Sequence, residues 1–92
     1  MNRRDRIEAL LRTAFAPVAL DVLDESARHR GHAGAAGGAG HFRVRLVSER
    51  FRGVARLARH RMVYDALAAE IGPEIHALAL ELAAPGETAT PG

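Results

Sequence analysis

Apolar and polar residues alternate strictly along residues 41–46. The apolar positions, each separated from the next by an arginine, are Phe42, Val44 and Leu46. This period of two predicts a strand with one buried face. Ser48, a residue type that often caps helices, follows directly and predicts the start of the next element.

Beyond Ser48 the apolar residues change to helical spacing, which predicts a tight turn followed by one long helix. Gly53 lies between the strand pattern and the helical pattern. Because glycine adopts positive φ without strain, it is suited to a turn at this point. The helix is expected to end at Ile71, because Gly72 and Pro73 form a strong stop signal. Its predicted apolar stripe consists of Val54, Leu57, Tyr64, Leu67 and Ile71.

An amphipathic helix is predicted over residues 2–15. Asn2 is a candidate N-cap, and Asp5 in the first turn is favoured by the helix dipole. Pro17 ends the helix. The apolar residues at helical spacing that define its buried face are Ile7, Leu10, Leu11, Ala14 and Phe15.

Two further stretches show the alternation of strands. Residues 18–24 predict a first strand, whose apolar positions are Val18, Leu20 and Val22. Residues 75–82 predict a third strand, which carries His76, Leu78, Leu80 and Leu82 on one face. The helical connection between the second and third strands favours a crossover over a hairpin.

The predicted element order is αββααβ, which corresponds to an α+β fold with a three-stranded sheet and helices packed on one face. From Ala84 the chain is polar and contains Pro85 and Pro91. Residues 84–92 are therefore expected to form a disordered tail. Residues 1–83 remain as one small domain with a modest core.

The segment Glu25–Gly40 carries no apolar periodicity. It spans 16 residues, contains five glycines and includes His29 and His32. Connections longer than about 12–15 residues without secondary structure are uncommon in compact domains and are usually functional or mobile. A flexible hairpin connection rich in small residues is the alternative interpretation.

Charge is divided unevenly along the chain. Residues 1–61 hold all 13 arginines and six acids, a formal charge of +7, whereas residues 62–92 hold five acids and no arginine, a formal charge of −5. This uneven distribution of charge is consistent with either a nucleic acid or an acidic protein as a partner. The arginines that would share one side of the predicted helical region are Arg50, Arg52, Arg56 and Arg59.

These four arginines support three interpretations. They form a solvated helix face, a stripe that contacts phosphates in a helix-turn-helix-like element, or a docking surface for an acidic protein. No pair of aromatic residues for base stacking accompanies them. Only contacts to a nucleic-acid backbone are therefore supported.

Composition argues against several classes of protein. The chain has no cysteine, so it has no disulfide framework and no thiolate of its own for a metal or for catalysis. It has neither an apolar run of the roughly 20 residues that a membrane span needs nor the apolar stretch of a signal peptide, so the cytosol is the expected compartment. No serine is paired with a base and no carboxylates pair at a strand end, so an enzyme is not expected.

Several motifs agree in order and spacing with one family. The chain resembles the BolA family from about residue 4 to residue 82. The resemblance implies a class II KH-like fold, and it implies two roles. One is partnership with a monothiol glutaredoxin around a shared 2Fe–2S cluster, in iron–sulfur trafficking or iron sensing, and the other is DNA-binding transcriptional regulation. The motifs are Asp24-Glu25-Ser26, His41-Phe42-Arg43-Val44, Val47-Ser48-Glu49-Arg50-Phe51-Arg52-Gly53, Arg59-His60-Arg61-Met62-Val63-Tyr64 and Ile75-His76-Ala77-Leu78-Ala79-Leu80.

The resemblance also implies which residues would ligate the cluster. By position these are His76 at the start of the last strand and His32 in the glycine-rich segment, with His29 as the competing residue because the segment is longer than in many relatives. Glutaredoxin and glutathione would supply the thiolates. Without the resemblance, His76 is better interpreted as a capping or core histidine. His41 and His60 are expected to be structural, and the final helix common in the family is expected to be missing.

Overall fold

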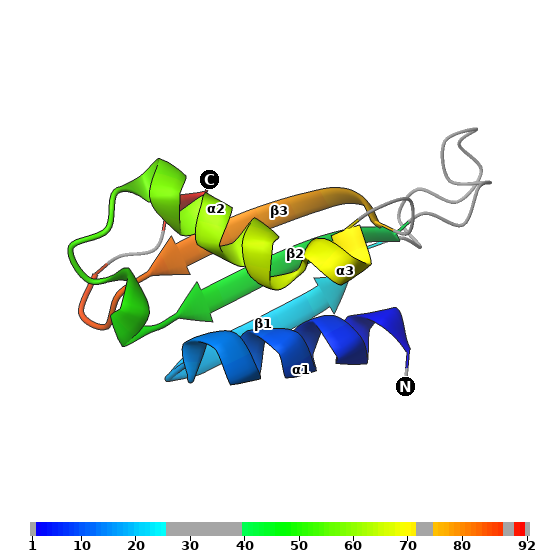
Figure 1. The fold of residues 1–92 in the computed structure, drawn as a ribbon, viewed down its shortest axis with the longest axis horizontal. Coiled ribbons are helices and arrows are strands. Elements are labelled where there is room, and N and C mark those ends of the chain that lie inside the picture. The colour runs from blue at the N-terminus through cyan, green and yellow to red at the C-terminus, as the bar shows by residue number, and fades with distance from the viewer. Residues whose placement is uncertain (1, 26–39, 72–74, 88–89, 92) are drawn as a thin grey trace.

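The computed structural model describes residues 2–25, 40–71, 75–87 and 90–91 (Figure 1). Its elements are α1 (Arg3–Phe15), β1 (Ala19–Asp24), β2 (Gly40–Val47), a 3₁₀ turn η3 (Glu49–Phe51), α2 (Arg56–Ala66), α3 (Ala68–Ile71), β3 (Ile75–Ala83) and β4 (Thr90–Pro91). The predicted α+β class and the order αββααβ are confirmed, with η3 and the two-residue β4 in addition.

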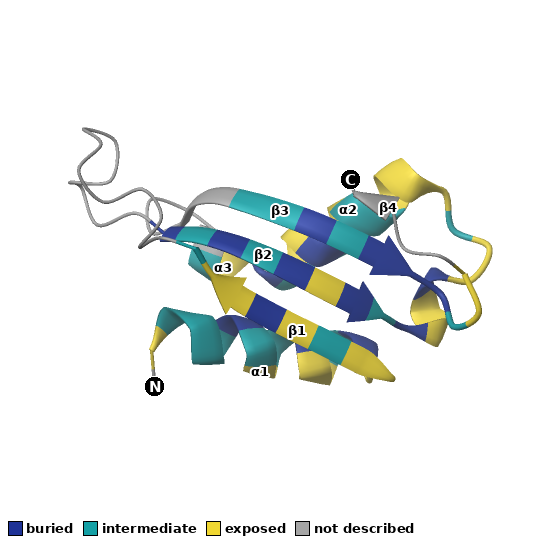
Figure 2. Ribbon diagram, turned by 180° about the vertical axis from the view of Figure 1, so that it is seen from behind, coloured by how far each residue is buried: buried dark blue, intermediate teal, exposed yellow. Residues whose placement is uncertain are grey.

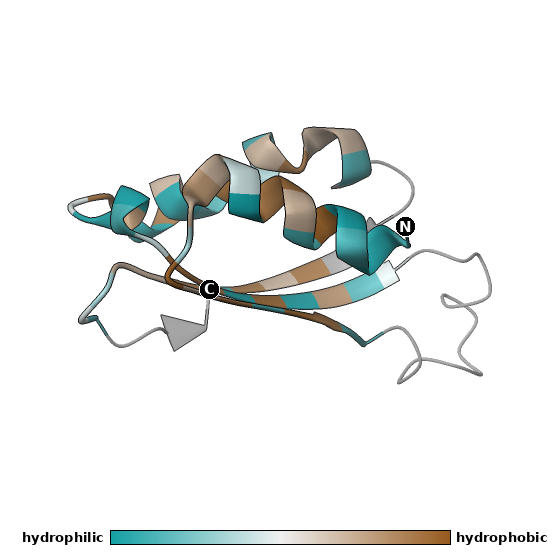
Figure 3. Ribbon diagram, turned by 90° about the horizontal axis from the view of Figure 1, so that it is seen from below, coloured by the Kyte–Doolittle hydropathy of each residue, from teal (hydrophilic) through white to brown (hydrophobic). Residues whose placement is uncertain are grey.

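The sheet has the strand order β1-β2-β3-β4. β2 pairs antiparallel with β1 and parallel with β3, and β4 pairs antiparallel with the end of β3. The parallel pair confirms the predicted crossover through α2 and α3. Seen along the edge of the sheet, the helices lie on one face and leave the other uncovered (Figure 3).

The core lies between that sheet face and the helices. On β2, Phe42, Val44 and Leu46 are buried while their neighbours are partly or fully exposed, as the alternation predicts (Figure 2). The buried residues of α1 are Ile7, Leu11 and Phe15. The ring of Phe15 packs at 5.1 Å, centroid to centroid, against that of Phe51 in η3. The predicted apolar faces of the first helix and of the second strand are confirmed.

Both predicted capping residues are confirmed. The Asn2 side chain accepts a hydrogen bond from the backbone N–H of Asp5. Ser48 is fully buried, accepts from the backbone N–H of Arg50 and donates its hydroxyl to the Phe15 carbonyl at 2.7 Å. One hydroxyl therefore caps η3 and also satisfies a carbonyl at the end of α1, which joins the two elements.

The predicted order has two helices after Ser48, as the structure does, but the expectation that the helix is continuous up to Ile71 was wrong. The chain instead divides into η3, α2 and α3, and Ala55 just before α2 is extended, with φ −64° and ψ 151°. Gly53 adopts the predicted positive φ, at 74°. These non-helical residues shift the phase of the helix that follows, because helical spacing counted through them no longer marks one face.

The buried face of α2 differs accordingly from the predicted stripe. Leu57 and Tyr64 were expected inside, but they are 64% and 41% exposed. Leu67 is fully buried, as predicted, and Val63, which was not part of the predicted stripe, is fully buried as well. Val18, which precedes β1, is 68% exposed, contrary to its predicted place on the apolar face of the first strand.

The tail predicted to be disordered from Ala84 differs from the structure at residues 84–87. Ala84 is fully buried, and its N–H donates to the Glu87 carboxylate at 3.0 Å. β4 then pairs with Glu81 and Leu82 of β3. A polar composition predicts disorder only when the charges lack partners, and Glu87 has a partner on α2.

Within the residues that the structure describes, no helix has the length and apolar character needed to cross a membrane.

Candidate functional site

The backbone places His76 at an irregularity in the sheet. Ile75 lies opposite Gly40 and Ala77 lies opposite His41, so the pairing shifts by one residue and His76 is the extra residue of β3. Such bulges interrupt the ladder and re-aim a side chain, and they are over-represented next to functional sites. The side chain of His76 lies outside the described residues, as do His29 and His32.

The same end of the sheet receives both ends of the segment that carries His29 and His32. Gly40, the first residue of β2, follows this segment and pairs with Ile75 at the start of β3. On the other side, the N–H of Glu25 donates to the carbonyl of His41 at 2.7 Å. The ends of the segment and the start of β3 therefore meet at one end of the central strand (Figure 1).

Gly40 is packed too closely to accept a side chain. A Cβ atom built on it would lie 3.0 Å from the ring atom Cζ of Phe42 and 3.1 Å from the guanidinium of Arg3. Glu25, at the other end of the segment, forms an ion pair with Arg43 at 3.4 Å. The points where the segment leaves and rejoins the sheet are therefore held by the core and by charge.

The described residues alone do not form a metal site. The chain has no cysteine, and the described part contains no cluster of three His, Cys, Asp or Glu residues that could hold an ion. The candidate ligands His29, His32 and the side chain of His76 lie outside the residues searched.

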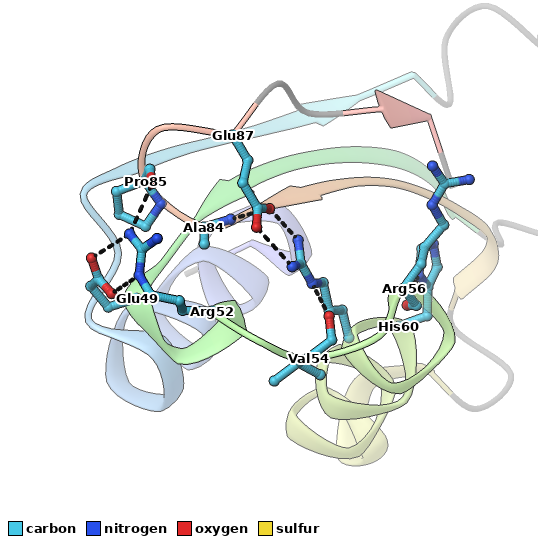
Figure 4. Close-up of polar contacts among 9 residues, drawn as sticks. Glu49, Arg52, Val54, Arg56, His60, Ala84, Pro85 and Glu87 are labelled. Carbon is cyan, nitrogen blue, oxygen red and sulfur yellow. Dashed lines mark hydrogen bonds and ion pairs between the residues drawn. The ribbon is translucent and has the colours of Figure 1, made fainter.

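Arg59, one of the four predicted interface arginines, is mostly buried, with 13% of its side chain exposed. Its Nη1 and Nη2 donate to the two carboxylate oxygens of Glu87 at 2.6 and 3.1 Å, and its Nε donates to the Val54 carbonyl at 2.7 Å (Figure 4). The guanidinium also lies 5.8 Å from the centre of the Phe51 ring. Every face of this cation has a partner within the chain, so Arg59 stabilises the fold.

The Arg59–Glu87 pair shifts the ionisation of both groups. Hydrogen bonds from Arg59 and from the backbone N–H of Ala84 lower the pKa of Glu87 from 4.5 to about 2. The hydrogen bond to Glu87 raises the pKa of Arg59. Nothing in the local sequence marks Glu87 as important, since its partner is 28 residues away.

The other predicted arginines do not form one continuous stripe. Arg52 donates to Glu49 twice at 2.8 Å and to the Pro85 carbonyl at 2.9 Å. The hydrogen bond to Glu49 raises the pKa of Arg52. Arg50 points to α1, where it donates to the Ala14 carbonyl at 2.7 Å. Arg52 and Arg59 thus face the turn at residues 84–87, and Arg50 faces elsewhere.

His60 has the structural role that the sequence predicts, but with a different partner. A loop carbonyl was expected, whereas Nδ1 lies 2.9 Å from the carbonyl of Arg56, one turn earlier in α2. A carbonyl only accepts, so Nδ1 carries the proton and donates it. His41 is half-buried in β2, as expected for a structural residue.

Comparison with known proteins gives consistent relatives. The chain is 54% identical over 80 residues to the DNA-binding transcriptional regulator BolA of Escherichia coli, a match that covers 87% of this chain and 73% of that protein. It is 44% identical to human BolA-like protein 1 over 88% of this chain and 60% of the human protein.

Solved structures agree in fold. The BolA domain of SufE1 from Arabidopsis thaliana superposes with a TM-score of 0.83 at 38% identity, covering 96% of this chain and 98% of that domain. The solution structure of mouse BolA1 gives a TM-score of 0.76 at 41% identity, over 92% of this chain and 67% of the mouse chain. The family model for BolA-like protein matches residues 11–87. The chain therefore belongs to the BolA-like protein family.

Proposed function

We propose that this protein is a non-enzymatic adaptor that binds a monothiol glutaredoxin and shares a 2Fe–2S cluster with it, in iron–sulfur trafficking or iron-responsive regulation. One observation carries the proposal. The bulge at His76 lies beside Gly40, where the segment with His29 and His32 rejoins the sheet. Two candidate imidazole ligands distant in sequence are thereby attached to the same end of one strand pair.

The ligands that this chain can offer fit a cluster shared with a partner, and they do not fit a cluster held by this chain alone. A 2Fe–2S cluster takes four ligands, and a chain without cysteine supplies only imidazoles. His76 and His32, or His76 and His29, would complete the set if glutaredoxin and glutathione each contribute a thiolate. Histidine ligation raises the reduction potential relative to all-cysteine sites and makes binding sensitive to protonation. Both properties suit a cluster that is cargo to be passed on or sensed.

The test is reconstitution of the heterodimer with glutaredoxin, glutathione, iron and sulfide, followed by absorbance and circular dichroism. We expect a spectrum distinct from that of the glutaredoxin homodimer, and we expect His76→Ala to abolish the difference. His60→Ala is the matched control, because this imidazole donates to a carbonyl within α2. An unchanged spectrum in His76→Ala would refute the ligand assignment. His29→Ala and His32→Ala, compared side by side, then identify the second ligand.

A second function is favoured by the name of the E. coli relative, a DNA-binding transcriptional regulator. In this alternative the chain binds DNA through its arginines, with Arg52 and Arg56 as the candidates, because Arg50 points to α1. Arg59 contributes little, because Glu87 already neutralises it.

DNA binding of this kind is tested by its salt dependence. Affinity for a duplex should fall steeply as salt rises, because phosphate contacts release counterions. The double variant Arg52→Ala/Arg56→Ala should weaken binding and flatten that slope. Arg59 is left intact, so that the turn at residues 84–87 keeps its ion pair with α2. Equal affinity for all duplex sequences would reduce this function to nonspecific charge attraction.

A further inference from the structure

The outer face of α2 presents apolar side chains to solvent. Leu57 is 64% exposed and Tyr64 is 41% exposed, and the two lie seven residues apart. Arg61, also exposed, lies between them, four residues after Leu57 and three before Tyr64. Residues at this spacing share one side of a helix. We refer to Leu57, Arg61 and Tyr64 as the α2 stripe.

Arg61 is the cation of this stripe. Within the described part of the chain, Arg61 takes part in no hydrogen bond or ion pair, unlike Arg52 and Arg59. Arginine and tyrosine are both enriched at protein–protein interfaces. A stripe that contacted phosphates alone would have no use for exposed apolar side chains.

A shallow groove adjoins the stripe. It has a volume of about 260 Å³, and its lining comes from the end of α1, from Arg50 and from α2: Ala14, Phe15, Arg50, Met62, Asp65 and Ala66. Asp65 follows Tyr64 directly and lies one helical turn after Arg61, so stripe and groove share an edge. A side chain projecting from a partner on the stripe would reach this groove.

The charge of α2 indicates which kind of partner would bind to it. α2 contains Arg56, Arg59 and Arg61 against the single acid Asp65, and Arg59 is neutralised by Glu87 of the turn at residues 84–87. The helix therefore presents net positive charge around an apolar line. The complementary surface carries apolar side chains flanked by carboxylates.

The stripe also leads toward the candidate site. Tyr64 lies in the last turn of α2, and α3 then leads to the start of β3. Figure 1 shows α3 at the end of the sheet where β2 and β3 begin. A protein that binds along α2 would therefore extend to the start of β3, where His76 lies.

From these observations we propose that the α2 stripe is the docking surface for the protein that completes the cluster site. That partner is an acidic protein whose apolar side chains pack on Leu57 and Tyr64 and whose carboxylate pairs with Arg61. The inference rests on the proposed adaptor function and adds to it the surface on which recognition occurs.

The test measures binding of a monothiol glutaredoxin, in its apo form and loaded with cluster, to the full chain by calorimetric titration. We expect Leu57→Ser/Tyr64→Ser to raise the dissociation constant at least about tenfold. Arg61→Glu should weaken binding and reduce its salt dependence. Val18→Ser is the matched control, because Val18 is 68% exposed but precedes β1, and it should leave the constant within about twofold of the wild type.

The outcomes separate this inference from the adaptor function. If glutaredoxin binds the wild type and the double variant equally well, the α2 stripe is not the docking surface, while the adaptor function stands. If the double variant loses only affinity for DNA, the face belongs to nucleic acid and the inference is overturned. If glutaredoxin binds no form of the chain, both fail. Arg61→Glu provides a second, independent test, because it reverses the charge of the α2 stripe and leaves its apolar side chains in place.

Discussion

Glu87 shows how much of this fold depends on a single carboxylate. Its two oxygens accept from Arg59, and one of them also accepts from the backbone of Ala84. The same guanidinium reaches Val54 just before α2. One residue therefore joins the turn after β3 to the start of the helix, and removing its charge would leave a mostly buried cation without its counterion.

The depressed pKa of Glu87 predicts a specific acid response. A carboxyl whose pKa is lower in the folded than in the unfolded state stabilises the fold above pH 4.5, and this stabilisation is lost as the pH falls toward about 2. Glu87→Gln should lower stability at pH 7 and should lose less stability than the wild type between these two pH values. Urea unfolding at a series of pH values measures both effects.

Glu49→Gln is the control for this experiment. Glu49 also pairs with an arginine, but both side chains are more than half exposed. Exposed pairs contribute little, so this variant should follow the wild type closely. A Glu87→Gln protein with the pH profile of the wild type would show that the pair is not stabilising.

Gly40 carries a second prediction at this scale. A methyl group there would overlap the ring of Phe42, and overpacking of this kind typically costs about 1–3 kcal/mol. Gly40→Ala should therefore lower the free energy of unfolding by about that amount, measured with urea. Gly86→Ala is a comparison without overlap, since nothing lies near its Cβ position and its cost comes only from φ of +89°. If Gly40→Ala is as stable as the wild type, the start of β2 shifts enough to accommodate the methyl group.

At the scale of elements, α2 is held by few side chains. Val63 is its one fully buried residue, Met62 and Ala66 are partly buried against the core, and Leu67, just beyond its end, is fully buried. Its opposite side carries the exposed Leu57 and Tyr64. A helix anchored lightly on one side and apolar on the other is suited to receive a partner.

Two leucines ten residues apart test this orientation. Leu67→Ala should destabilise the protein by about 2–5 kcal/mol, because it empties a fully buried position. Leu57→Ala should change stability by less than about 0.5 kcal/mol, because its side chain is mostly in water. Thermal unfolding of the two variants under one condition gives the comparison. Equal losses would place Leu57 in the core and remove the basis of the docking surface.

For the whole molecule, the important property is what the chain does not contain. It has no cysteine, and its described part has no group of residues that could hold a metal ion. The helices cover one face of the sheet (Figures 1 and 3), and the bulge at His76 lies at the end of the sheet where β2 and β3 begin. Under the proposed adaptor function, the chain would supply one part of a shared site and the partner would supply the rest.

This organisation predicts that the isolated chain does not assemble a cluster. Incubation with iron, sulfide and glutathione should leave no visible chromophore on the protein after desalting, whereas addition of glutaredoxin should produce one. Absorbance and iron content measure the result. A stable cluster on the chain alone would contradict the division of ligands between two molecules.

The sequence by itself determined the local features of this protein. Strict alternation identified β2 and its buried face, Asn2 and Ser48 identified two caps, and Gly53 identified a positive φ. The absence of cysteine limited the chain to imidazole ligands. These features depend on neighbours within a few residues, where spacing and residue type carry the information.

Only the tertiary structure decided which face of α2 is buried, what neutralises Arg59 and where β3 slips against β2. Helical phase was lost across the extended residue Ala55, the partner of Arg59 is 28 residues away at Glu87, and the bulge at His76 exists only relative to Gly40. Each depends on pairs of residues that folding brings together, and periodicity along one segment contains no information about such pairs.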